Sequence, residues 1–297
     1  MPRETKKDKE TDSLWMPRYK KIVKGGIYHI IQRAPGKEIV FCESADYLYF
    51  LHILKKTCKE SRLELFSFAL LPNHLHLLLK LEEENLPQAM KKIFTAYAMY
   101  FNAKYKRKGH VFYGRYRASF CNDERYLITL SVYIHLNPIK AGLCIKLGDY
   151  PWSSLNLYLK DKKSDFVNSE YILTMLHTQI NEARNIYKNI LENSAKLSME
   201  NAIENNKAPF RFALEALKFL PSAQNKKIKN TFELEQIDEK IKMLKATKVF
   251  KKPQDKEALS YMIDQLKSRG MSQREIAKIL GVHRTTIYRV SKSTATK

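Results

Sequence analysis

Four short stretches in the first half of the chain alternate in side-chain character with the period of a β-strand. They are GGIYHIIQRA at 25–34, LELFSFAL at 63–70, the segment beginning HLHLLLK at 74–80 and VFYGRYRASF at 111–120. A turn that contains Pro72 and Asn73 separates the second from the third. These two are therefore expected to form a hairpin.

Three longer segments repeat apolar residues every three to four positions, as an amphipathic helix does. The first is 46–61, and the second begins at Pro87. The third runs from a capping sequence at 122–124 to Asn137, where Pro138 is expected to limit it.

The order of these elements is strand, helix, two strands, helix, strand and a further helix. It predicts an α+β fold with a split βαβ, ferredoxin-like antiparallel sheet and helices on one face. The other face would be open to a ligand. This plan alone assigns no function.

The composition changes after about residue 157. The pattern predicts a charged, mobile tail at 1–18, a strand-rich domain at 19–157, a helical connector of unknown role at 158–250 and an all-α module at 251–297. The connector is rich in Lys, Asn and Glu and contains no recognisable site.

The chain has 297 residues with 53 Lys and Arg against 31 Asp and Glu, a net charge of +22. So large a surplus favours a polyanionic partner, with nucleic acid first and an anionic membrane surface second. No apolar run approaches bilayer length and the N-terminus has no apolar signal core, so we expect a cytoplasmic, nucleoid-associated protein without membrane contact. Its four cysteines lack CxxC spacing and are expected to be reduced thiols.

His74 and His76 lie one residue apart in an otherwise apolar strand. Alternation places both on one face, while Leu75 and Leu77 point into the core. Two neutral imidazoles on one face supply half of a metal site. Taken alone, the pair also fits two ordinary hydrogen-bonded histidines.

Tyr133 and Asn137 lie one turn apart on one face of the third predicted helix, and His135 is turned away from them. A divalent ion held by two imidazoles and an amide oxygen keeps positions open for a phosphate. Tyr133 would then supply a nucleophilic phenol. Taken alone, one of 17 tyrosines is more simply a packing residue.

Five motifs occur in a fixed order along the first half of the chain: GGIYH at 25–29, LPNHLH at 71–76, GRYR at 114–117, YIHLNPIKAGL at 133–143 and WSS at 152–154. Together they resemble the REP-associated tyrosine transposases, which are single-tyrosine HUH transposases of the IS200-like family. The resemblance covers about half the chain, residues 19–157.

The resemblance implies that His74 and His76 bind Mg²⁺ or Mn²⁺, that Asn137 completes the coordination and that Tyr133 is the nucleophile. The implied activity is DNA transposition and recombination, in which hairpin DNA of the REP type is cleaved and rejoined through a covalent 5′-phosphotyrosine.

The resemblance also places the strand that carries Arg115 and Arg117 near the single-stranded or hairpin DNA. Members of the family occur as monomers and as dimers. Both a monomer and a homodimer therefore stay open for this chain.

The segment SQREIAKILGVHRTTIYRV at 272–290 fits a helix-turn-helix with Gly281 in the turn. It resembles the helix-turn-helix of serine recombinases. On its second helix, Arg284, Thr285, Thr286 and Arg289 are expected to contact duplex DNA.

Two other functions stay open. The first is a sequence-specific DNA-binding regulator that uses the same domain mainly to hold DNA. The second is a metal-dependent phosphoesterase that uses water instead of Tyr133. A covalent protein–DNA adduct would separate the phosphoesterase from the transposase.

Overall fold

The structure is a computed structural model that describes residues 22–36, 38–121, 123–197, 208–221, 263, 272–280 and 282–293. The tail predicted at 1–18 lies outside these residues, as does most of the segment from 222 to 271.

The centre of the fold is a sheet of four antiparallel strands. They are β1 (Ile27–Arg33), β2 (Leu63–Leu71), β3 (His74–Leu81) and β4 (Arg117–Cys121), in the order β2-β3-β1-β4. Each strand–helix–strand unit therefore has one strand of the other unit between its own two strands, which is the split βαβ plan. The predicted α+β, ferredoxin-like fold class is confirmed.

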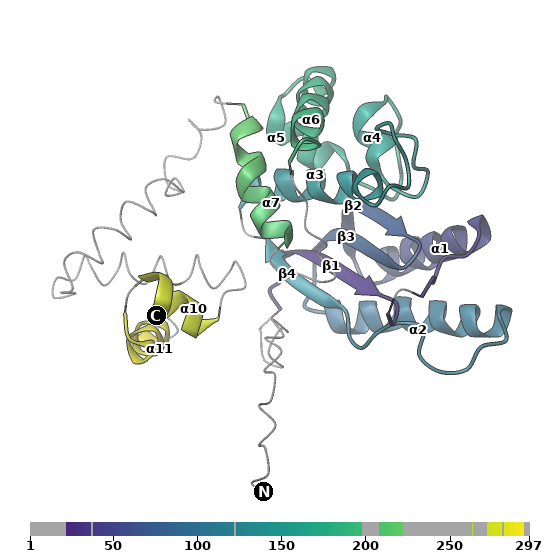
Figure 1. The fold of residues 1–297 in the computed structure, drawn as a ribbon, viewed down its shortest axis with the longest axis horizontal. Coiled ribbons are helices and arrows are strands. Elements are labelled where there is room, and N and C mark those ends of the chain that lie inside the picture. The colour runs from purple at the N-terminus through teal and green to yellow at the C-terminus, as the bar shows by residue number, and fades with distance from the viewer. Residues whose placement is uncertain are drawn as a thin grey trace, which may run out of the picture.

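Two layers of helices enclose the sheet (Figure 1). On one face lie α1 (Ser44–Glu60) and α2 (Leu86–Lys104). On the other lie α3 (Glu124–Lys140), α4 (Leu155–Leu159), α5 (Glu170–Leu176), α6 (Ile180–Ser194), α7 (Ala208–Ala216) and a short 3₁₀ turn, η1 (Leu217–Phe219). The expectation of an open second face is wrong, because this face also carries apolar residues, and α3 and the helices after it bury them.

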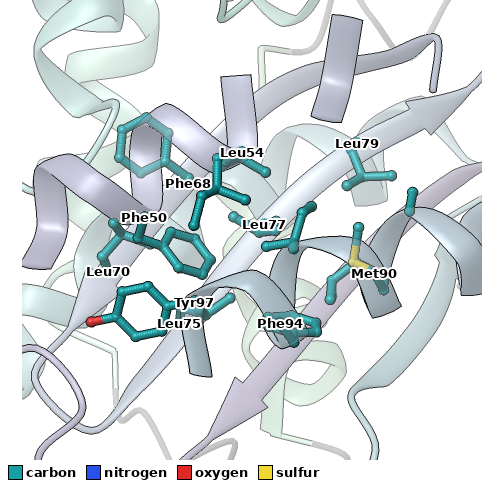
Figure 2. Packing of buried hydrophobic residues seen from close by; sticks show 14 of the residues in the cluster. Phe50, Leu54, Phe68, Leu70, Leu75, Leu77, Leu79, Met90, Phe94 and Tyr97 are labelled. Atoms are coloured by element: carbon teal, nitrogen blue, oxygen red, sulfur yellow. The ribbon is translucent and has the colours of Figure 1, made fainter. Parts of the chain in front are cut away.

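The first layer forms because alternate residues of the strands meet the apolar stripes of α1 and α2. Leu75, Leu77 and Leu79 of β3 point into this core, as predicted for the first two (Figure 2). Phe50 of α1 and Tyr97 of α2 pack against each other there, with ring centroids 5.2 Å apart.

The fourth strand is shorter than predicted, because it begins at Arg117 and not at Val111. Gly114 has a φ of +61°, which extended strand residues do not adopt. The loop before β4 is nevertheless attached to β1, since the Tyr113 amide donates to the Arg33 carbonyl at 2.8 Å.

The predicted end of the third helix is also wrong. Pro138 lies inside α3, which continues to Lys140. Gly142 ends the helix at a φ of +70°, and the amides of Gly142 and Leu143 donate to the carbonyls of Ile139 and Pro138. This is a Schellman motif, so a glycine and not the proline stops the helix.

A buried polar network joins α3 to the helices that follow it. His135 bonds through Nδ1 to the Tyr187 hydroxyl and through Nε2 to the Ser154 hydroxyl, both at 2.8 Å. Ser131 contacts the same Tyr187 hydroxyl at 2.9 Å. Helices after residue 157 thus share a core with α3, while the domain boundary drawn at that residue stays a prediction.

The C-terminal module is described over α10 (Gln273–Leu280) and α11 (Arg284–Ser293), which pack against each other. Ile276 and Ile287 are buried. Gly281, predicted in the turn, lies outside the described residues. None of the helices described along the chain is long and apolar enough to cross a membrane.

The His135 network predicts a loss of stability in acid. Burial lowers the pKa of His135 from its usual 6.5 to about 3, so between these values the unfolded chain binds a proton that the folded chain does not. The contribution of neutral His135 is complete above pH 6.5 and is lost as the pH falls. Acidification from neutrality to pH 5 should lower the unfolding free energy by about 2 kcal/mol through this residue.

Urea unfolding at both pH values tests this, with His135→Gln removing the titrating group. The variant should lose less stability on acidification than the wild type. His52, exposed on α1, provides the control, and His52→Gln should behave like the wild type. An equal acid loss in His135→Gln and wild type would contradict the assignment.

Candidate active site

The predicted histidine pair lies at the start of β3, directly after the turn. His74 and His76 are both buried, and their rings lie edge to face with centroids 5.2 Å apart. His74 Nδ1 donates to the side-chain oxygen of Asn73 at 2.7 Å, since that oxygen can only accept. The Nε2 atom of His74 therefore carries the lone pair.

A third histidine, which the sequence analysis did not single out, completes a cluster. His29 of β1 stacks on His76 with ring centroids 5.1 Å apart and an interplanar angle of 14°. Its Nε2 lies 2.9 Å from His76 Nδ1, a hydrogen-bond distance. The two-residue period of β1 could have revealed His29 as a site residue. Tyr28 and Ile30 face the core under α1 and α2, so His29 must face the other side of the sheet.

Tyr133 of α3 lies beside this cluster. Its ring meets His76 edge-on at 5.8 Å and His29 edge-on at 6.4 Å between centroids. Asn137, one turn later, donates its amide nitrogen to the Tyr133 carbonyl at 2.7 Å. That bond leaves the amide oxygen of Asn137 available as a ligand.

Electrostatics keep the imidazoles neutral. Burial lowers the pKa of His29 to about 3 and that of His74 to about 4. Burial, and then the nearby His29 and His74, hold the pKa of His76 well below its usual value. Neutral imidazole is the form that binds metals, so these residues are ready as ligands at neutral pH.

The arrangement fits a divalent metal bound by His74, His76 and the Asn137 oxygen. His76 Nε2 is buried and has no hydrogen-bond partner among the described residues, so a ligand there would satisfy it. In the described part of the chain, no three His, Cys, Asp or Glu side chains form a metal-binding group. The predicted third ligand, the Asn137 amide oxygen, is not one of these side-chain types, and its role stays a prediction.

Helix α7 covers the candidate nucleophile. Phe212 packs on Tyr133 with ring centroids 5.3 Å apart, and the Tyr133 side chain has no exposed surface. The pattern of the sequence predicted helices in this region but did not indicate that one of them closes this site.

Basic and aromatic residues lie around the C-terminal end of β1, next to the histidines. Arg33 pairs with His74 across β1 and β3, and Arg117 pairs with Ile31 across β1 and β4. Burial, and then the charge of Arg33, lower the pKa of Arg117. The Arg33 guanidinium lies 4.7 Å from the ring centre of Tyr113, which is half exposed. A cation stacked on an exposed aromatic ring is suited to a phosphate and an unpaired base.

The predicted DNA-contacting residues have different environments. Arg115 is exposed in the loop before β4, and Arg117 is half-buried in β4 itself. On α11, Arg284, Thr285 and Arg289 are exposed and Thr286 is partly buried. The arginines near β4 and the residues of α11 are thus candidate DNA contacts in two separate parts of the chain.

Two parts of the chain match families of known proteins. Residues 22–137 match the family described as IS200-like transposase, and residues 261–291 match a helix-turn-helix domain family. This part of the chain is therefore similar to the IS200-like transposases. All of the candidate catalytic and metal-binding residues lie within this IS200-like domain.

Two solved structures are similar to part of this chain. A structure described as a REP-associated tyrosine transposase bound to a REP hairpin has a TM-score of 0.43 and 18% identity, over 52% of this chain and 94% of that chain. A transposase of Deinococcus radiodurans R1 has a TM-score of 0.29 and 22% identity, over 40% of this chain and 95% of that chain.

A Haemophilus influenzae protein named as a REP-associated tyrosine transposase is 29% identical over an alignment of 152 residues, and the match covers 46% of this chain and 84% of that protein. The family match and this relative confirm the resemblance predicted from the sequence motifs.

Proposed function

We propose that the protein cleaves and rejoins one strand of hairpin DNA, with Tyr133 as nucleophile and Mg²⁺ or Mn²⁺ held by His74, His76 and Asn137. The observation that carries the proposal is the position of Tyr133 in the IS200-like domain. Its ring packs edge-on against His76, 5.8 Å between centroids, where buried neutral imidazoles converge.

The cleavage step is a displacement at phosphorus. The Tyr133 oxygen attacks the phosphate, the bond from phosphorus to the 3′ oxygen breaks, and the DNA keeps its 5′-phosphate as a phosphotyrosine. The phenol gives its proton to solvent and the leaving 3′ oxygen takes one up. Attack by a 3′-hydroxyl on the phosphotyrosine reverses the step, so rejoining needs no ATP.

The residues around Tyr133 have separate tasks. His74 and His76 would present Nε2 lone pairs from one face of β3, and Asn137 would present its amide oxygen from α3. A metal bound there would withdraw charge from the phosphate during attack. Burial keeps both imidazoles neutral, so no proton competes for their lone pairs near neutral pH.

Access to Tyr133 requires a rearrangement. While Phe212 lies on the Tyr133 ring, no phosphate can reach the phenol. Cleavage therefore needs the displacement of α7 from α3. The same burial favours a second candidate function, a DNA-binding regulator that never cuts.

The charge of the chain and the name of one relative support the proposed substrate. The Haemophilus influenzae protein is named as REP-associated, and REP elements form hairpins, so we infer a hairpin of this type. Arg115, Arg117 and the Arg33–Tyr113 pair would contact its single-stranded part. The exposed Arg284, Thr285 and Arg289 of α11 would bind flanking duplex.

Replacing the nucleophile tests the function. Tyr133→Phe removes one oxygen from a packed ring, so cleavage of hairpin DNA with Mn²⁺ and the covalent adduct should both disappear while DNA affinity stays within about twofold. Denaturing gels measure the adduct and filter binding measures the affinity. Tyr126→Phe removes the same oxygen seven residues earlier on α3 and should keep both activities.

Three outcomes separate the candidate functions. Cleavage without an adduct in the wild type, unchanged in Tyr133→Phe, would identify a phosphoesterase that uses water. Tight binding with no cleavage by the wild type would identify a regulator. An adduct that persists in Tyr133→Phe would place the nucleophile elsewhere.

The C-terminal module is expected to affect how strongly DNA binding depends on salt concentration. Replacing Arg284 and Arg289 by Ala should weaken binding to a hairpin with flanking duplex and lower the slope of log K against log salt by about two units, because two phosphate contacts are lost. Cleavage of a hairpin without flanking duplex should be unchanged. Lys162→Ala with Lys163→Ala, in an exposed loop after α4, removes the same charge as a control. An equal slope in both double variants would rule out phosphate contacts by α11.

A further inference from the structure

The strand register fixes where the His29 side chain lies. In β1, Tyr28 and Ile30 enter the core under α1 and α2, so His29 and Ile31 face the opposite layer. Ile31 pairs with His76 across the two central strands, which makes His29 the diagonal neighbour of His76 on the same face. The two rings are stacked at 5.1 Å and 14°.

The contact between His29 and His76 holds a single proton. Both imidazoles are buried, and a neutral ring has one N–H and one lone pair. The 2.9 Å contact joins His29 Nε2 to His76 Nδ1, so either ring can be the donor. Which ring donates decides whether His76 Nε2 carries a proton or a lone pair.

The two possible donors, His29 and His76, lead to different states of the buried His76 Nε2. If His29 donates, His76 carries its proton on Nε2, and that N–H is buried with no hydrogen-bond partner among the described residues. If His76 donates, its Nε2 has a lone pair, which a metal can use. Only the second arrangement makes His76 a ligand.

We propose that His29 is a positioning residue that accepts a hydrogen bond from His76 Nδ1–H and so holds His76 with its Nε2 lone pair toward the metal. His74 has a matching arrangement, because its Nδ1 donates to Asn73 Oδ1 at 2.7 Å. In both histidines an acceptor bonded to Nδ1–H then leaves the Nε2 lone pair available to the metal. His29 is not a ligand in this scheme, since its Nε2 is already bonded to His76.

This inference rests on the proposed metal site, so the test needs one measurement with metal and one without. In the full-length protein, His29→Gln places an amide oxygen near the position of imidazole Nε2 and keeps an acceptor. His29→Leu keeps a similar bulk without an acceptor. His52→Gln removes an exposed histidine from α1 as a control.

With metal, Mn²⁺ titration followed by electron paramagnetic resonance gives the affinity. His29→Leu should bind Mn²⁺ about 10–100-fold more weakly than the wild type, as is usual when the hydrogen-bond acceptor of a metal-binding histidine is removed. His29→Gln and His52→Gln should stay within about threefold of the wild type. Equal binding by His29→Leu and wild type, or equal loss in His29→Gln and His29→Leu, would overturn the proposal.

Without metal, ¹⁵N nuclear magnetic resonance of histidine-labelled protein reports the tautomer of His76. The wild type should show His76 protonated at Nδ1, and His29→Leu should lose that preference. Protonation at Nε2 in the wild type would overturn the proposal whether or not the protein binds metal. If the tautomer is as expected and no metal binds, the proposed metal site fails and the positioning contact stands.

Discussion

The fold and the candidate site both depend on the two-residue period of the central strands β1 and β3. One face of these strands is apolar and packs on α1 and α2. The same period then forces His29, His74 and His76 onto the other face, against α3. A one-residue shift of register would send the imidazoles into the apolar core, so the pairing that stabilises the sheet also assembles the cluster.

Burial has opposite consequences for the ligands and for the nucleophile. It keeps the three imidazoles neutral at physiological pH, which is the state that binds a metal. It also encloses Tyr133, whose ring lies under Phe212 of α7. The His135 network with Tyr187 and Ser154 ties α3 to the helices that follow it, so the access proposed above is displacement of α7 and not of α3.

Much of the fold was predictable from the sequence because periodicity reports which residues share a face. It identified all four strands and placed Leu75 and Leu77 in the core. It could not say which helices cover the second face, since an apolar face does not identify its partner. Pro138 was wrongly predicted to end the helix, because the cap at Gly142, four residues later, ends it. The role of His29 depends on the register between β1 and β3, which no single strand reveals.

The proposed function requires that neutral imidazoles on β3 hold a divalent metal beside Tyr133. An anomalous difference map at the manganese edge, from crystals soaked in Mn²⁺, tests it most directly. One strong peak is expected within bonding distance of His74 Nε2 and His76 Nε2, on the side that faces Tyr133, with the Asn137 side-chain oxygen as a further ligand. A peak elsewhere, or none at these nitrogens in a protein that binds Mn²⁺ in solution, would contradict it.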